Sequence, residues 1–481
     1  MMKRTDGILA IMCFLLMIQP AIAIANQDAG AWKAGVSRMV ITPREPMWMA
    51  GYANRDHPAE GTLNDLWAKA LVLQDAKGKQ SVLITLDLAA IPKDLSDFIR
   101  SQLNTKYHLS KAQILINCSH THSGPVLTNS VPNAYNLNPE QTQKMNRYTA
   151  NLAKQIVQLV GEAYKSLQDV DISTGNGFAR FQVNRRNNNE PFLLLQPELK
   201  GPNDYAVPVI KVADKSGNIL AIAFGYACHN TVLNGYQWSG DYAGFAQLEL
   251  EKMYPGATAL FFQGAGADQN PMPRRTVALA KQYGKELAFA VENVLSKPMA
   301  QQLPQLSFTY SEVPLPLNAP PAKEVLETMT KDSSAPYKQR SALDLLNKMK
   351  KGTASIKSYP YPVQVWKIGA QPLVALGGEL VTHYAIEIKK LFGPNTFVLG
   401  YSNDIMAYIP SAEILRQSND KEEGYAFYNP TNPGSIAYEG GLSTQLLFGL
   451  PGTWASNIET VILNEVQRLA KATGVPLAVY Q

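Results

Sequence analysis

The chain has 481 residues, of which 46% are hydrophobic, 17% charged and 9% aromatic. This composition is typical of a globular protein and excludes a disordered or fibrous chain, and the length suits one large catalytic domain or two packed domains. The formal net charge is +5 at pH 7, without a long run of lysine or arginine. Nucleic acid is therefore not expected as a partner.

Residues 1–25 have the three-part pattern of a secretory signal peptide. Positive charge near Lys3 precedes an apolar run at 8–18, and small residues follow up to Ala25. The apolar run is too short to cross a bilayer. We therefore expect an exported protein, in the periplasm or the medium, whose mature domain spans residues 26–481.

The hydrophobic pattern predicts strands and helices that interleave along the chain. In the first half, strands are expected at 34–43, 66–73, 81–88, 170–174, 206–212, 219–226 and 257–263, together with one that starts at Ile114 and ends at two histidines, and helices at 95–105, 140–166 and 243–253. In the second half, helices are expected at 275–295, 322–330, 338–349 and 454–472, and strands at 363–368, 372–376 and 396–399. We see no internal repeat, and the proline-rich stretch Pro314–Pro321 is the best candidate for a boundary. The pattern predicts a mixed, layered α/β fold with active-site loops at the ends of strands.

Two histidines stand at the end of one predicted strand. The apolar run that starts at Ile114 is followed by His120 and His122, and alternate side chains of an extended segment share a face. Other strand-like runs end near His229 and near Glu379, and converging strand ends build the active sites of open α/β sheets. Two histidines with a carboxylate form a common catalytic zinc shell with one position left for water. The pattern indicates a metal site or an acid/base pair.

Each of these residues also has an ordinary structural interpretation. His120 and His122 are equally compatible with hydrogen-bonded histidines at a strand end, and His229 with a buried histidine of the core. Glu379 suits the N-terminus of a helix, where a carboxylate is favoured by the helix dipole. His383 lies four residues further on and fits a packing role. The sequence contains no His-Glu-x-x-His helix motif. It also contains no Gly-x-Ser-x-Gly elbow, and this second absence argues against a serine hydrolase of the α/β type.

Five sequence blocks, taken in order, resemble a known family. They are Asn117–Pro125 (Asn-Cys-Ser-His-Thr-His-Ser-Gly-Pro), Cys228-His-Asn with Ser239–Gly244 behind it, Gly378-Glu379, Ala407–Glu413 (Ala-Tyr-Ile-Pro-Ser-Ala-Glu) and Tyr438–Gly441 (Tyr-Glu-Gly-Gly). Together they are similar to the ordered motifs of the neutral/alkaline ceramidases, which are zinc amidases that cut the N-acyl bond of ceramide. A single block is weak, but five in the family's order are fairly specific.

The resemblance implies a role for each matching residue. It implies zinc ligation by His120, His229, Glu379 and Tyr408. It further implies that His122 is the general acid/base, that Tyr438 stabilises the oxyanion and that Arg185, in an Asn-Arg pair, stands at the mouth of the site. Such a set is chemically coherent, because zinc acidifies a water and polarises a carbonyl while a histidine moves the proton.

The chain departs from the family pattern at several places. The family carries a serine in the loop that corresponds to Gly266–Pro271, and this chain has Gln269 there. We expect Asp268 and Gln269 to bind a polar part of the substrate. Well-known members also carry a C-terminal β-sandwich domain, for which the chain ending at Gln481 has no room. Residues from about Ser418 to Ser435 form an insertion expected to reshape the mouth of the site.

These observations predict an exported zinc-dependent hydrolase that cleaves the N-acyl amide of ceramide-like lipids and contacts membrane surfaces transiently. Two alternatives stay open. The first keeps the zinc and acts on a polar, glycan-linked or other amide or ester. The second is a non-catalytic exported binding protein that has kept the metal shell.

Overall fold

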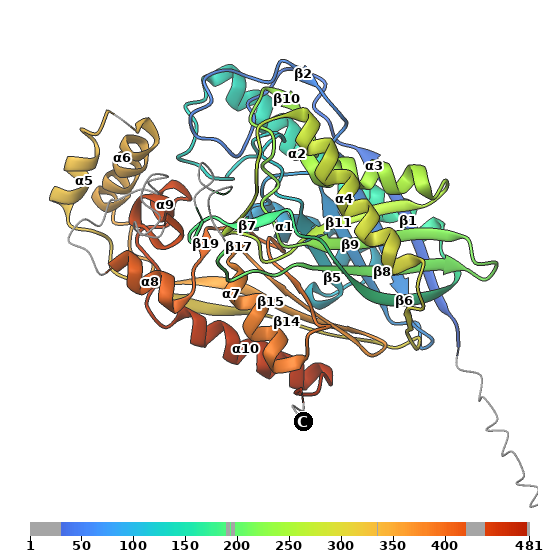
Figure 1. The fold of residues 1–481 in the computed structure, drawn as a ribbon. Coiled ribbons are helices and arrows are strands. Elements are labelled where there is room, and N and C mark those ends of the chain that lie inside the picture. The colour runs from blue at the N-terminus through green and yellow to red at the C-terminus, as the bar shows by residue number, and fades with distance from the viewer. Residues whose placement is uncertain (1–29, 189–192, 194–197, 334, 420–437, 479–481) are drawn as a thin grey trace, which may run out of the picture.

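The computed structural model describes residues 30–188, 193, 198–333, 335–419 and 438–478. In these residues two large β-sheets pack face to face, and helices cover both outer faces (Figure 1). The predicted mixed, layered α/β architecture is confirmed. The predicted signal peptide (1–25) lies outside the described residues, and so does nearly all of the predicted insertion at 418–435. Among the described residues, no helix has the length and hydrophobicity needed to span a bilayer.

The larger sheet has the strand order β11-β9-β8-β6-β1-β3-β4-β5, and β13 pairs with β6. Its strands are β1 (Trp32–Val40), β3 (Trp67–Gln74), β4 (Gln80–Leu86), β5 (Ile114–Cys118), β6 (Gln168–Phe178), β8 (Ala206–Asp214), β9 (Ile219–Tyr226), β11 (Thr258–Gln263) and β13 (Ala300–Gln301). Most neighbours are antiparallel, but β4–β5 and β9–β11 are parallel. Parallel neighbours need a crossover connection. Helix α1 (Lys93–Tyr107) supplies the first and α3 (Asp241–Met253) the second.

The second sheet has the order β14-β15-β16-β18. Its strands are β14 (Leu306–Pro316), β15 (Ser358–Ile368), β16 (Gln371–Leu376) and β18 (Phe397–Leu399). The expected boundary at Pro314–Pro321 begins inside β14, where Pro314 pairs with Pro360. Proline is tolerated there because β14 is an edge strand with a partner on one side only. The start of this stretch is therefore strand rather than linker, a correction to the sequence-based expectation.

Successive residues of each strand face two different cores. Leu83 and Leu115 point between the sheets, where they share a core with Trp366 and Leu373. Their neighbours, such as Ile84, point to the helical side. This alternation follows from the period of two in extended chain. The sheets are thus held by a continuous apolar layer that fixes the strand ends relative to one another.

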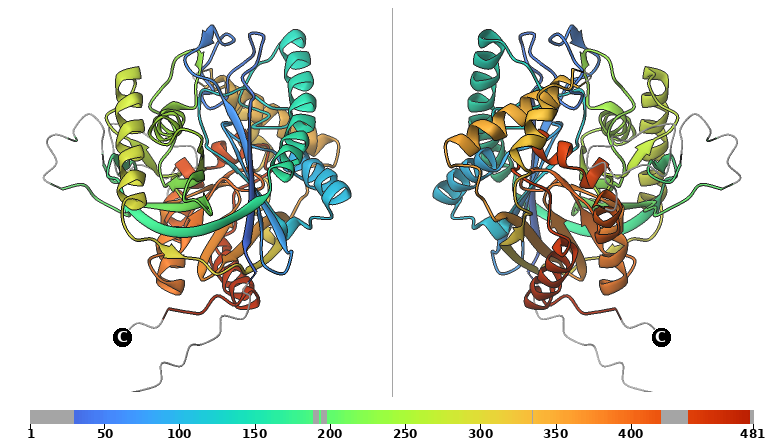
Figure 2. Two further views of the ribbon diagram at one scale, coloured as in Figure 1. Left: turned by 90° about the vertical axis from the view of Figure 1, so that its right-hand side faces the viewer. Right: turned by 90° about the vertical axis from the view of Figure 1, so that its left-hand side faces the viewer.

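Helices cover the outer face of each sheet (Figure 2). The long helix α2 (Pro139–Lys165) packs across β1 and β3, while α3 and α4 (Val277–Leu295) cover the end of the sheet that contains β8, β9 and β11. Helices α7 (Thr382–Phe392) and α10 (Ile458–Thr473) contribute to the core on the outer face of the second sheet. The order of layers is therefore helix, sheet, sheet, helix.

The remaining described elements are mostly short. They are β2 (Gly61–Thr62), η1 (Lys111–Gln113), β7 (Gln182–Asn184), β10 (Gln237–Trp238), β12 (Gln269–Pro271), α5 (Lys323–Met329), α6 (Pro336–Lys350), β17 (Glu379–Leu380), β19 (Tyr408–Ile409), α8 (Ala412–Asn419), η3 (Tyr438–Gly440) and α9 (Leu442–Leu447). Helices α5, α6 and α9 share a small hydrophobic core of their own. They form the projection on the left of Figure 1.

Candidate active site

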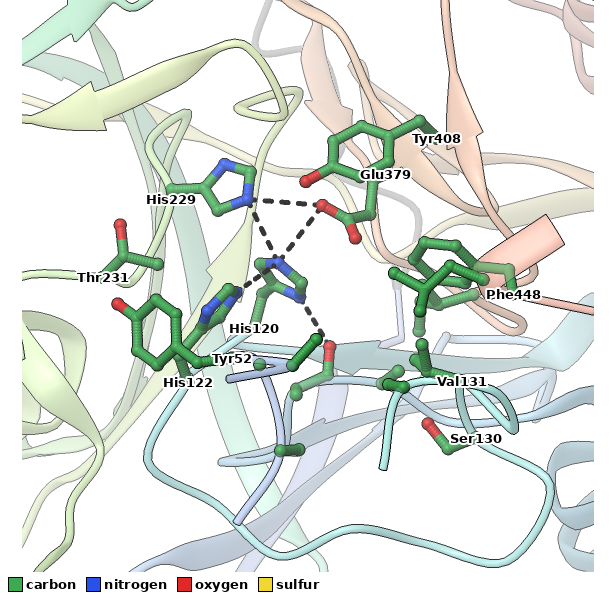
Figure 3. Close-up of a pocket in the computed structure, with 18 of the residues that line it drawn as sticks. Tyr52, His120, His122, Ser130, Val131, His229, Thr231, Glu379, Tyr408 and Phe448 are labelled. Atoms are coloured by element: carbon green, nitrogen blue, oxygen red, sulfur yellow. Dashed lines mark hydrogen bonds and ion pairs between the residues drawn. The ribbon is translucent and has the colours of Figure 1, made fainter. Parts of the chain in front are cut away.

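The candidate ligands come from strand ends in both sheets, as the sequence predicted. His120 and His122 follow β5, and His229 follows β9. Glu379 begins β17, which pairs in parallel with β19 so that Glu379 is opposite Tyr408. Figure 3 shows these five side chains directed toward one another. The strand framework therefore assembles residues that are up to 288 positions apart (120 to 408).

The backbone turns sharply where the first histidine leaves its strand. His120 has a φ of 58°, a left-handed conformation that is costly for a residue with a side chain. Its N–H donates to the carbonyl oxygen of Leu88, and the ring of Tyr401 packs 4.4 Å from its ring. The contact with Tyr401 and the hydrogen bond to Leu88, which follows β4, thus stabilise the strained backbone at His120.

The tautomers of two histidines follow from their hydrogen bonds. His120 Nδ1 lies 2.6 Å from the carbonyl oxygen of Ala89, and His229 Nδ1 lies 3.0 Å from that of Gly266. A carbonyl oxygen only accepts, so each Nδ1 carries the proton and each Nε2 presents a lone pair. Metal-binding histidines are usually oriented by such a bond.

The two lone pairs meet a carboxylate. The Nε2 atoms of His120 and His229 are 3.3 Å apart, and Glu379 Oε2 lies 3.2 Å from the first and 3.3 Å from the second. Glu379 Oε2 is buried and has no hydrogen-bond partner in the part of the chain that the structure describes. Three acceptor atoms without a shared proton repel one another unless a cation lies between them. Two nitrogens at about 2.1 Å from a tetrahedral zinc would be separated by roughly 3.4 Å, so the donor set fits zinc.

Burial and charge set the protonation of this group. Burial lowers the pKa of His229 to about 4, which keeps its imidazole neutral at neutral pH. Burial opposes the charge of Glu379, but a proton on either neighbouring histidine holds the pKa of Glu379 well below the ordinary value, and a bound cation would act in the same direction. A neutral imidazole and an ionised carboxylate are the forms that coordinate a metal.

His122 lies beside the ligand set and also belongs to it geometrically. Its Nε2 is 3.1 Å from that of His120, and the ligand atoms of all three histidines lie within 4.8 Å of one another. Burial and the other two histidines lower the pKa of His122 well below its ordinary value. Its Nδ1 is buried without a hydrogen-bond partner. The geometry allows His122 to act as a third histidine ligand or as the base beside the metal.

Packing fixes the ring of His122. Tyr52 contacts it edge-on with ring centroids 4.8 Å apart. A Cβ added to Gly51 would lie 2.3 Å from the ring, and Gly51 has a φ of 101°. Glycine is therefore required at position 51, both for the backbone conformation and for the close approach of the imidazole.

Arg185, Tyr408 and Tyr438 line the same cavity as the histidines. The guanidinium of Arg185 lies 5.6 Å from the ring centroid of Tyr408 and 5.7 Å from that of Tyr438. Buried Glu439 accepts hydrogen bonds from Arg185 at 2.8 Å and 3.1 Å, and from Arg186 at 3.0 Å. Burial opposes the charge of Glu439, but these arginines hold its pKa below the ordinary value. The ion pairs keep Arg185 in place against both tyrosines.

The structure places Asp268 beneath the site rather than in the cavity. Its carboxylate accepts from the N–H and the hydroxyl of Thr382, at 2.8 Å and 2.7 Å, and from Asn184 at 3.1 Å. Its carbonyl oxygen accepts from the N–H of Arg185. It therefore joins the start of α7, just after Glu379, to the segment that carries Arg185.

Gln269 also lies outside the cavity, where it forms hydrogen bonds with the surrounding backbone. Its side chain donates to the carbonyl oxygen of Ala227 and accepts from the N–H of Asp204, while its own carbonyl accepts from the N–H of His229. Neither Asp268 nor Gln269 is among the residues that line the cavity. Contact of these two side chains with a substrate stays a prediction, which the geometry does not support. His383 pairs with Glu459 at 3.1 Å and does not line the cavity either.

The histidine group lies at the base of a cavity of about 310 Å³. In Figure 3, Tyr52 and Thr231 are on one side of the histidines, and Val131 and Phe448 are on the other. Val131 and Phe448 make the second side largely apolar, with Ser130 beside them, and the lining also includes the apolar Val126, Ala134, Ile405 and Leu447. Arg275, which donates a hydrogen bond to Tyr52, and Arg274, which also acts on that tyrosine electrostatically, line the cavity near the first side. The cavity therefore has one apolar and one cationic end, with the histidines between them.

Several residues of the site were not identified from the sequence. Gly51 and Tyr52 lie in a stretch whose only visible signal was a turn, and Tyr401 has no motif around it. Glu439 is part of the Tyr438–Gly441 block, yet a single carboxylate there gave no indication of its arginine partners. Only the fold shows which ring or guanidinium each of these side chains contacts.

Comparison with known proteins adds the class to this geometry. Residues 32–271 match the family model described as neutral/alkaline non-lysosomal ceramidase, N-terminal. The fold is similar to the solved structure of neutral ceramidase from Pseudomonas aeruginosa, with a TM-score of 0.68 and 18% identity over 94% of this chain and 76% of that one. It is also similar to a solved ceramidase complexed with C2, with a TM-score of 0.66 and 16% identity over 94% of this chain and 77% of that one. No curated protein sequence matches the chain.

The fold is thus that of the neutral ceramidase structures. The chain belongs to the neutral/alkaline non-lysosomal ceramidase family, as its sequence blocks predicted. At such low identity the structural likeness establishes the fold alone, so substrate and catalytic roles need their own argument.

Proposed function

We propose that the chain is a zinc-dependent amidohydrolase that cleaves the N-acyl amide of ceramide-like lipids. The observation that carries this proposal is the meeting of unprotonated Nε2 atoms of His120 and His229 with Glu379 Oε2 at the base of a half-apolar cavity. Membership of the ceramidase family supports the choice of an amide bond.

His120, His229 and Glu379 would hold the zinc ion, and Tyr408, opposite Glu379 in the strand register, would be the fourth ligand. Bound zinc supplies a Lewis acid that acidifies water and polarises a carbonyl group. The ligand histidines need no rearrangement to receive it, because their Nδ1 protons are already bonded to carbonyl oxygens.

The other residues bind and move protons. His122 is neutral and faces the ligands, so its Nε2 can take the proton of the attacking water and return it to the leaving amine. Burial raises the pKa of Tyr438, which keeps its hydroxyl protonated and able to donate to the carbonyl oxygen as negative charge develops there. Arg185, held by Glu439, fixes the position of both tyrosines.

The apolar end of the cavity suits the acyl chain of a lipid. Burying methylene groups there is favourable by about 0.8 kcal/mol each. A lipid substrate implies brief contact with a membrane surface. We also propose that the protein is exported, because residues 1–25 have the pattern of a signal peptide.

Metal content and amide cleavage test this function together. The purified protein should contain one zinc per chain by elemental analysis and should cleave a short-chain fluorescent ceramide until a chelator removes the metal. Zinc without cleavage of ceramide would still be consistent with a zinc hydrolase, and its substrate would then be sought among polar amides and esters. Zinc without cleavage of any amide or ester would favour the non-catalytic binding protein, and a protein that binds no zinc would overturn the proposal.

His122→Ala separates the two geometrically allowed roles of this residue. As the base it should leave the zinc content at one per chain and lower turnover by about 10²–10⁴-fold. As a ligand it should lower zinc affinity as strongly as His120→Ala does. Competition with a chromogenic chelator measures the affinity directly.

A further inference from the structure

One end of the cavity has a chemistry that a neutral lipid does not require. Arg275 donates to the hydroxyl of Tyr52 at 2.9 Å, and its guanidinium lies 5.4 Å from the ring centroid of that tyrosine. Because Tyr52 also packs on His122, only one aromatic ring separates Arg275 from the predicted base. The N–H of Arg275 donates to Val232, the residue after Thr231, which places both on the same side. Arg274 lines the cavity as well.

Among the described residues, few carboxylates lie near Arg275. Arg275 forms no ion pair with a carboxylate in the described part of the chain. Arg55 also lies over the Tyr52 ring, at 4.9 Å from its centroid, and among the described residues it donates only to the carbonyl oxygens of Ala50 and Gly235. The nearby carboxylate, Asp241, is buried and accepts from the backbone N–H groups of Val232, Leu233 and Tyr242. The arginine end of the cavity is therefore electropositive.

Two buried polar atoms on the cavity lining also have no hydrogen-bond partner among the described residues. They are the hydroxyl of Thr231, which is 2% exposed, and Oδ1 of Asn270, which is 3% exposed. Buried polar groups are almost always hydrogen-bonded, so such atoms in a cavity lining indicate a polar ligand. The hydroxyl can donate to an anionic oxygen, and the amide oxygen can accept from an N–H or O–H of the substrate.

We propose that the end of the cavity formed by Tyr52, Thr231 and Arg275 binds an acid group, so that the preferred substrate is a fatty N-acyl amine whose amine part carries a carboxylate, phosphonate or sulfonate. The acyl chain occupies the opposite end, at Val131 and Phe448, and the amide lies over the histidines. Hydrolysis adds water across the amide bond and releases a fatty acid and an amino acid or amino acid analogue. This inference rests on the proposed amidohydrolase function and specifies its substrate class.

A matched pair of substrates tests the proposal. N-dodecanoylglycine and N-dodecanoylglycinamide share the acyl chain and the scissile amide, and only the first carries a negative charge. The wild-type zinc enzyme should prefer the glycine conjugate by at least tenfold in kcat/KM, and raised salt should reduce the preference. N-dodecanoyl-aminomethylphosphonate and N-dodecanoyltaurine then show which acid group is preferred.

The double variant Arg274→Gln/Arg275→Gln tests the residues. Loss of the Arg275–Tyr52 bond disturbs the support of His122 and lowers turnover of both substrates, so the ratio of kcat/KM values is the readout. The ratio should fall to about one. The control Lys281→Gln/Lys285→Gln removes two charges from exposed positions of α4 outside the cavity and should keep the wild-type ratio.

The outcomes separate this proposal from the proposed function. If the wild type cleaves both substrates with a ratio of kcat/KM values near one, the acid-group site is overturned and the amidohydrolase function is supported. Cleavage of neither would contradict the amidohydrolase on this class of amide. Calorimetric binding of the two compounds then decides the site alone, since tighter binding of the glycine conjugate, lost in the arginine variant, supports it and equal binding overturns it.

Discussion

Two buried polar regions lie next to each other in this protein and differ in how their atoms are paired. In the loop of Asp268 and Gln269, the carboxylate accepts three hydrogen bonds, and the amide both donates and accepts. In the group of His120, His229 and Glu379, the acceptor atoms face one another at 3.2–3.3 Å, and Glu379 Oε2 has no hydrogen bond.

The difference distinguishes a supporting region from a ligand site. Both regions are withdrawn from solvent, so an unpaired polar atom costs free energy in either one. The loop avoids that cost within the chain, whereas the histidine group would avoid it with a cation between its acceptor atoms. Residue type and burial alone would not have separated the two regions. The pairing of individual atoms does.

The largest expected effect comes from removing a ligand. His229→Ala and Glu379→Ala should each lose zinc and lower turnover by at least about 10³-fold, because both take away an atom that faces the ion. Elemental analysis and the fluorescent amide assay measure the two effects. His383→Ala is the matched control, since His383 pairs with Glu459 outside the cavity, and it should keep the metal and the activity. Normal zinc in His229→Ala would refute the ligand set.

Removing the paired carboxylate should affect stability instead. Asp268→Ala leaves the Thr382 N–H without an acceptor and takes from the Asn184 amide one of its two acceptors, the other being the carbonyl oxygen of Pro202, which should cost about 3–5 kcal/mol of unfolding free energy. Urea unfolding measures the loss. The variant Asp268→Asn keeps one acceptor oxygen and should lose about half as much. If Asp268→Asn unfolded normally and raised KM, the substrate contact predicted from the sequence would be right.

The sequence predicted most of the fold because its signals are local. Period-two and period-3.6 patterns placed β3, β4, β5, β9 and β11 and helices α1 to α4 within a few residues. It missed β14, although apolar Leu306, Phe308 and Tyr310 alternate there with polar residues, because the prolines at the end of this strand favoured a boundary instead. Glu379 was expected to begin a helix, but it forms a two-residue strand because β19 pairs with it, and α7 starts at Thr382.

The site was predictable where a motif carried it. The motif blocks led to His120, His122, His229, Glu379 and Tyr408, and the structure brings all five together. Asp268 and Gln269 were assigned to the substrate because they lie in a motif loop, but sequence proximity says nothing about which way a side chain points. Long-range contacts, such as those of Tyr52 and Arg275 at the cavity end, have no local signal at all.

A smaller effect is expected from crowding the base while leaving the ligands intact. Gly51→Ala would place a methyl group 2.3 Å from the ring of His122 and should displace it, lowering turnover by about 10–100-fold at normal zinc content. The alanine also strains the backbone at φ 101°. Gly78→Ala controls for that strain, because Gly78 has a φ of 79° and open space around it. Equal activity of Gly51→Ala and wild type would show that His122 has no precise position to lose.

The smallest effect concerns a carboxylate that is only half paired. Asp404 accepts from the Tyr359 hydroxyl at 2.7 Å through one oxygen, while its other oxygen is buried without a partner. Burial raises the pKa of Asp404 to about 7, against 3.8 for the ordinary group. The folded state therefore favours the protonated form. Its contribution to stability is complete below pH 4 and is lost as the pH rises from about 4 to 7.

Asp404→Asn should remove this dependence. Between pH 5 and pH 8 the unfolding free energy of the wild type should fall by on the order of 2 kcal/mol relative to the variant, as measured by urea unfolding at both pH values. Tyr359→Phe provides a second comparison, since it deletes the one hydrogen bond that lowers the pKa of Asp404 and should extend the loss to higher pH. Parallel pH profiles for wild type and Asp404→Asn would mean that this carboxylate is already ionised at pH 5, and that partial pairing suffices to keep a buried charge.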